Sequence, residues 1–127
     1  MYSRIVVGTD GSDRSLIAVD HAARLAAVCA AELHVVAASS PNEVRSAHPS
    51  AATIGRDASR RHGVRVVEHP HVGDPAVVLM AVAAAVDADL IVVGNKRIAG
   101  RVSRFPGSVP GRLAHDAHCP LLIVHTG

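Results

Sequence analysis

The sequence predicts an α/β fold, a doubly wound five-stranded parallel sheet of order 3-2-1-4-5 with helices on both faces. Five short apolar runs alternate with helical stretches along the chain. The runs are almost continuously apolar, which is typical of parallel strands buried on both faces. Hydrophobic residues make up 49% of the 127 residues and aromatic residues only 2%, so Val, Ile, Leu and Ala must fill the core. Right-handed crossovers then leave few topologies, and this order is the simplest.

The first strand is predicted at residues 5–8 (IVVG) and the second at residues 33–38 (LHVVAA). Between them, residues 12–28 predict a helix, because apolar side chains recur at helical spacing. That face consists of Leu16, Val19, Ala22, Ala23 and Ala26. Residues 39–50 contain two prolines and are expected to be a loop.

A weaker helix is predicted at residues 51–61, with Gly63 as its stop signal. Residues 64–72 carry charged and histidine side chains among valines, which favours a strand at the edge of the sheet. Asp74 is then a natural N-cap, and Pro75 suits the first helical position, where no amide hydrogen is needed.

The second half of the sheet follows that helix, which is expected to end at about Val86. Residues 88–93 (ADLIVV) predict the fourth strand, and a loop occupies residues 94–108. A helix from Ser108 to about Asp116 and a strand at Leu121–Val124 complete the pattern.

The expected order makes the first and fourth strands neighbours where the winding reverses. Ligands of such sheets bind at the carboxyl ends of the strands that flank the reversal. Residues 8–12 and the loop from Gly94 should meet there.

The loop over residues 94–108 has the features of an anion site. Gly94, Gly100 and Gly107 would let a ligand approach the backbone closely. Gly107 and Ser108 open a helix, whose free amides and positive dipole end suit an anion. The loop also has four basic residues, Lys96, Arg97, Arg101 and Arg104. We expect an anionic ligand such as a phosphate, although an ordinary surface loop with solvated charges would have the same composition.

Composition argues against several other classes of protein. The net charge is only +2, with one Tyr and one Phe, so we expect no nucleic-acid binding and no flavin. No apolar run reaches the ~18 residues of a membrane helix, and the first residues lack signal-peptide organisation. We therefore expect one domain over residues 1–127, located in the cytoplasm, with no membrane partner.

Metal binding and catalysis find little support. Cys29 and Cys119 are far apart and are expected to be free. His69 and His71 alternate on one side of a strand, and His115 and His118 lie near Cys119, but a structural zinc site needs four convergent ligands. We expect no metal site. Neither a G-x4-G-K-[ST] loop nor a G-x-S-x-G elbow is present, so we expect no enzyme.

The sequence resembles the universal stress proteins. The segments that match occur in order over nearly the whole chain: IVVGTDGS, HVV, VGDP, ADLIVVGN, GSVP and CPLLIVH. The resemblance implies the same sheet order, in a Rossmann-like fold of the adenine nucleotide alpha hydrolase-like kind. It also implies a homodimer formed through the last strand, Leu121–Val124.

Many members of that family bind ATP through a G-x2-G-x9-G-[ST] signature. Gly94 matches its first glycine, Gly107 and Ser108 match its end, and residues 98–106 supply the nine between. Arg97 stands at the second glycine. Three alternatives stay open: Gly100 supplies the flexibility, Arg97 contacts a phosphate, or Arg97 fills the pocket.

The resemblance implies individual nucleotide contacts. Asp10 would accept hydrogen bonds from the ribose or the adenine edge, with Thr9 beside it, although Asp-Gly-Ser is also ordinary turn chemistry. Val35 would pack on the base and offer its backbone, and Val93 would line the pocket next to Gly94. The phosphates would be held by Gly107, Ser108 and Val109.

The strings GN, IAGR, GSVP and LIVHT resemble a cyclic-AMP-binding branch of the family. We therefore expect ATP or cyclic AMP as ligand of a stress or signalling module, with Mg²⁺ carried by the nucleotide near Asp10. ATP hydrolysis would be slow at most, because no base or arginine finger is evident. The alternative, favoured by Arg97, is a dimeric interaction module that binds no nucleotide.

Overall fold

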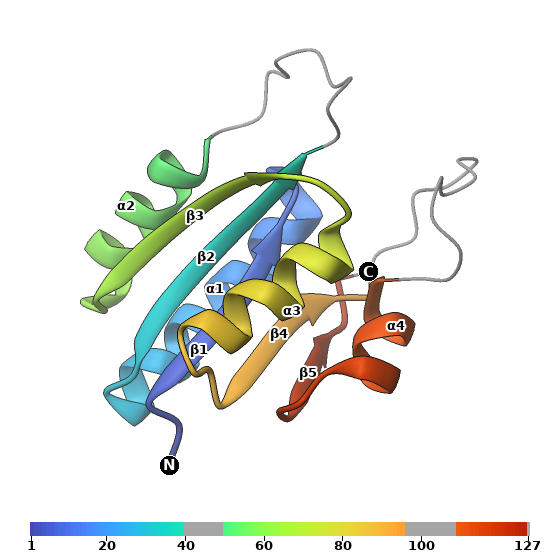
Figure 1. Cartoon of the computed structure of the whole chain (residues 1–127). Coiled ribbons are helices and arrows are strands. Elements are labelled where there is room, and N and C mark those ends of the chain that lie inside the picture. The colour runs from blue at the N-terminus through green and yellow to red at the C-terminus, as the bar shows by residue number, and fades with distance from the viewer. Residues whose placement is uncertain (40–49, 96–108, 127) are drawn as a thin grey trace.

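Five parallel strands form one sheet in the order β3-β2-β1-β4-β5 (Figure 1). The computed structural model describes residues 1–39, 50–95 and 109–126. The strands are β1 (Arg4–Thr9), β2 (Glu32–Ser39), β3 (Val66–Val72), β4 (Leu90–Gly94) and β5 (Leu121–Val124). The helices are α1 (Asp13–Cys29), α2 (Ala51–His62), α3 (Pro75–Ala85) and α4 (Val109–Asp116). The predicted fold class and strand order are confirmed, and β3 is an edge strand as expected.

Two hydrophobic clusters explain why the central strands β1 and β4 are almost continuously apolar. One cluster joins Ile5 and Val7 of β1 to α1 and α2, and the other joins Val6 to α3 and α4. Successive strand residues point to opposite faces, so a strand covered on both faces must be apolar at every position. Four alanines of α1 are fully buried, which lets that helix lie close to the sheet.

The helix ends follow the predicted signals. Asp74 caps α3 by accepting a hydrogen bond from the backbone N–H of Ala76 at 3.3 Å, and Pro75 is the first helical residue. Gly63 ends α2 with a φ of 67°, a left-handed conformation that glycine adopts without strain. The predicted loop over residues 39–50 lies, apart from its two ends, outside the described residues.

The two cysteines of the chain, Cys29 and Cys119, are both free thiols. Among the described residues, no group of three or more His, Cys, Asp or Glu side chains is arranged to hold a metal ion. No helix within the described ranges is long and apolar enough to cross a bilayer.

Candidate functional site at the carboxyl ends of β1 and β4

The topology places the end of β1 beside the end of β4. The two strands pair in parallel, with Val7 opposite Val92, so both chains leave the sheet at the same edge. β1 leads into residues 10–12, and β4 leads into Asn95. This is the reversal point of the winding, as the sequence predicted.

A network of hydroxyl groups fixes the turn after β1. Thr9 is 7% exposed, and its Oγ1 lies 2.6 Å from Oγ of Ser15. The Ser15 hydroxyl donates to the backbone oxygen of Ser12, so Thr9 is the donor in the bond that joins the two hydroxyls. Thr9 Oγ1 also accepts from the backbone N–H of Gly11 at 3.0 Å, and Gly11 has a φ of 83°. Thr9 is therefore a structural anchor for the turn.

Asp10 is the exposed residue of that turn. Its Oδ1 accepts a hydrogen bond from the backbone N–H of Ser12 at 2.9 Å, in the manner of an Asx turn. The bond orients the carboxylate of Asp10 at the carboxyl ends of β1 and β4. Asp10 can therefore stabilise the turn through Oδ1 and still fill its predicted role as a ligand contact.

Gly94 has a packing reason to be glycine. A Cβ added there would lie 3.0 Å from Cγ2 of Thr126 and 3.9 Å from Cβ of Ala18. Any larger side chain would push the segment after β5 away from β4. The close packing of Thr126 thus requires a glycine at position 94, the first glycine of the signature.

Asn95 fastens that segment to the end of β4. Its Oδ1 accepts from both the backbone N–H and the hydroxyl of Thr126, at 2.8 and 3.1 Å, and its Nδ2 lies 2.9 Å from Nδ1 of His125. Its backbone N–H donates to the oxygen of Val124 at 3.0 Å. These contacts of Asn95 were not predicted from the sequence, in which the only signal was an amide residue directly after an apolar strand.

Replacing Asn95 with alanine should lower the free energy of unfolding by about 1–3 kcal/mol, because Thr126 is 6% exposed and would lose the acceptor for two donors. Chemical denaturation measures the change. The control is Asn95→Asp, which retains the acceptor oxygen and should lose less. Equal losses in the two variants would show that the oxygen is not what holds Thr126.

Val35 and Val93 are core residues rather than surface residues. Val35 is fully buried in the cluster with α1 and α2, and Val93 is 4% exposed in the cluster with α3 and α4. Residues 37–39 at the end of β2 are half-buried and are thus more accessible than the Val35 side chain. The remaining expected contacts at Arg97, Gly107 and Ser108, with the other loop residues 96–108, lie outside the described residues.

Val109 begins α4, and an ion pair holds that helix against α3. Arg112 lies 2.5 Å from Oδ2 of Asp74, the same carboxylate that caps α3. The hydrogen bond to Asp74 raises the pKa of Arg112. Val109 itself is half-buried and packs on the cluster beneath α3. The ion pair therefore holds α4 beside the start of α3.

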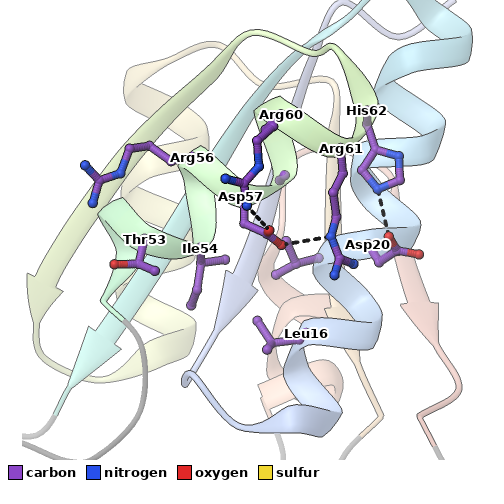
Figure 2. Close-up of a pocket in the computed structure, with 11 residues that line it drawn as sticks. Leu16, Asp20, Thr53, Ile54, Arg56, Asp57, Arg60, Arg61 and His62 are labelled. Atoms are coloured by element: carbon purple, nitrogen blue, oxygen red, sulfur yellow. Dashed lines mark hydrogen bonds and ion pairs between the residues drawn. The ribbon is translucent and has the colours of Figure 1, made fainter.

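Two cavities lie elsewhere in the described structure. A groove of about 410 Å³ runs between α1 and α2 (Figure 2), and one of about 530 Å³ lies at the amino ends of the strands, beside Arg4 and Glu32. In the first groove, Arg60 and Arg61 pair with Asp57 at 3.2 and 3.3 Å. These arginines are already neutralised in part, which makes the groove a weaker anion site than its arginine count suggests.

Comparison with known proteins agrees on one family. A model of the universal stress protein family matches residues 1–125. Universal stress protein Rv1636 of Mycobacterium tuberculosis is 36% identical over 146 residues, covering 98% of this chain and 97% of that protein. A universal stress protein crystallised in complex with cAMP is 38% identical, with a TM-score of 0.76 over 99% of both chains. One from Archaeoglobus fulgidus in complex with dAMP shares the fold at 24% identity, with a TM-score of 0.70 over 96% of this chain and 97% of that one.

Proposed function

Since this chain belongs to the universal stress protein family, we propose that it binds an adenine nucleotide, cyclic AMP or ATP, at the carboxyl ends of β1 and β4. The observation that carries the proposal is the meeting of Asp10 with the Gly94 end of β4 at the point where the winding reverses. The relative solved with cAMP, 38% identical, supports the same ligand class.

Each part of the proposed site has a role. Asp10 accepts hydrogen bonds from ribose hydroxyls, and its carboxylate is the nearest ligand for Mg²⁺ when ATP is bound. Thr9 holds the turn that presents Asp10, and residues 37–39 with the backbone of Val35 flank the base. Gly94 and Val93 form the wall at β4. Gly107, Ser108 and Val109 supply amides to the phosphates, and Arg97 adds a charge-assisted contact.

Isothermal titration of the full chain with cyclic AMP, ATP and AMP tests this proposal. We expect saturable heat with one nucleotide per chain and a dissociation constant below about 100 μM, near −5.5 kcal/mol. The absence of heat with all three nucleotides would contradict it. Arg97→Gly, which restores the family signature, is the matched variant. Binding by Arg97→Gly alone would show that Arg97 fills the pocket and would favour the alternative function.

The alternative is a dimeric interaction module that binds no nucleotide. The edge strand β5 could form the dimer interface whether or not a nucleotide binds. β5 is an edge strand, and Ile123 on it is 46% exposed. We propose that two copies associate through Leu121–Val124. Sedimentation velocity of wild type and Ile123→Lys tests this, and a wild-type monomer at high concentration would contradict it.

We further propose that residues 1–127 form one cytoplasmic domain that regulates through ligand occupancy rather than turnover, with at most slow ATP hydrolysis. Asp10 accepts a hydrogen bond from the backbone N–H of Ser12, which holds its carboxylate in the turn after β1.

A further inference from the structure

A buried histidine links two strands on the α3 side of the sheet. His34 of β2 is 4% exposed, and both of its ring nitrogens are hydrogen bonded. Nε2 lies 2.7 Å from Oε1 of Glu32, and Nδ1 lies 2.8 Å from Nε2 of His69 on β3. His71 stacks on His69 with ring centroids 6.3 Å apart. The nucleotide site proposed above uses none of these side chains.

The number of protons shared by Glu32, His34 and His69 decides whether both hydrogen bonds among them are kept. With both rings neutral, His34 donates from Nε2 to Glu32, and its bare Nδ1 accepts from His69. With one added proton, His34 donates from both nitrogens, and His69 turns its bare Nε2 toward His34. Both states keep two hydrogen bonds. With a second added proton, two N–H groups face each other across 2.8 Å, and the His34–His69 bond is lost.

We propose that Glu32, His34 and His69 form a proton-operated switch that fastens the edge strand β3 to β2 and opens when the second proton binds. Among the described strands, β3 pairs with β2 alone, because it lies at one end of the sheet. The loss of the His34–His69 hydrogen bond, together with repulsion between two imidazolium rings, therefore acts on an edge strand, which the sheet supports on one side.

The charges around the switch place the second proton on His69. Burial lowers the pKa of His69, and His34 and His71 lower it further, while Glu68 opposes them. Glu32 lies 2.7 Å from Nε2 of His34 and is itself approached by Arg65 at 3.5 Å. Arg4 lies across from Glu32 in the β1 register, and α3, which covers the neighbouring sheet face, has no titratable side chain between Pro75 and Ala85.

The sign of the pH effect follows from that shift. The unfolded chain takes up a proton at His69 near pH 6.5, whereas the folded chain takes it up at a lower pH. The folded state is thus fully favoured above about pH 6.5 and loses stability as the pH falls toward the folded pKa of His69. β3 should separate from the sheet before the other strands do, because the second proton binds His69, which is a residue of β3.

Hydrogen exchange of the full chain tests the switch, with rates corrected for the intrinsic pH dependence of exchange. Between pH 7.5 and 5.5 the protection of β3 amides in the wild type should fall about tenfold, which is the size of effect expected for the loss of one hydrogen bond. His69→Gln can still donate to His34 but cannot be protonated, so its β3 protection should stay constant. The control His115→Gln, on the exposed end of α4, should behave as the wild type does.

Ring ¹⁵N spectra of the wild type give a second measurement that needs no variant. We expect His34 to keep a hydrogen-bonded ring proton throughout the range, with His69 gaining its second proton last. The same fall in β3 protection in His69→Gln would overturn the proposal. Independent titration of the two rings near pH 6.5, with no change in β3 protection, would also overturn it.

Discussion

Replacing Ile91 with alanine should lower the free energy of unfolding by about 3–4 kcal/mol. Ile91 is the second residue of β4, is fully buried and belongs to the cluster that contains Leu79, Val82 and Leu113 of the helices on that face. With so few aromatic residues in the chain, each large aliphatic side chain fills much of the core. The truncation leaves a cavity between the sheet and α3 that the backbone cannot close.

Two variants control for the chemistry of the Ile91 substitution. Ile91→Val removes one methylene and should cost about 1 kcal/mol. Ile17→Ala removes the same atoms from a side chain that is 47% exposed on α1, and its effect should stay below about 1 kcal/mol. Urea denaturation measures all three. Equal losses for Ile91→Ala and Ile17→Ala would contradict the assigned core.

Replacing Asp10 with asparagine should weaken nucleotide binding at least about tenfold, because a hydrogen bond to a charged group contributes about 1.5–3 kcal/mol. The amide oxygen can still accept from the N–H of Ser12, so the turn and the thermal stability should be retained. Asp13→Asn is the matched control, since it removes an acidic charge from the first turn of α1 nearby. Titration calorimetry compares the two variants, and equal binding in both would remove Asp10 from the site.

The fold could be predicted from sequence because each of its determinants is local. Continuous apolar strands follow from burial on both faces, and Asp74 with Pro75 marks a helix start whatever surrounds it. The handedness of crossovers then limits the strand order. The polar residues of β3, such as Glu68 and His69, correctly indicated the edge of the sheet.

The side-chain links could not be predicted, because they join residues that only the tertiary structure brings together. Asn95 meets Thr126 from 31 positions away, and His34 meets His69 from 35. His34 stands in an apolar run, where its spacing gives no sign of a partner. The burial of Val35 also follows from the tertiary structure, because its side chain packs in the core between the sheet and two helices, and its predicted contact with the base stays a prediction.

The most direct test of the proposed site is amide chemical-shift mapping during titration with cyclic AMP and, separately, ATP. We expect the largest shifts at residues 9–12, at residues 93–95 and at the start of α4. The groove between α1 and α2, lined by Ile54 and Arg56, should show little change. Shifts concentrated in that groove, with none at Asp10 or Gly94, would contradict nucleotide binding at the carboxyl ends of β1 and β4.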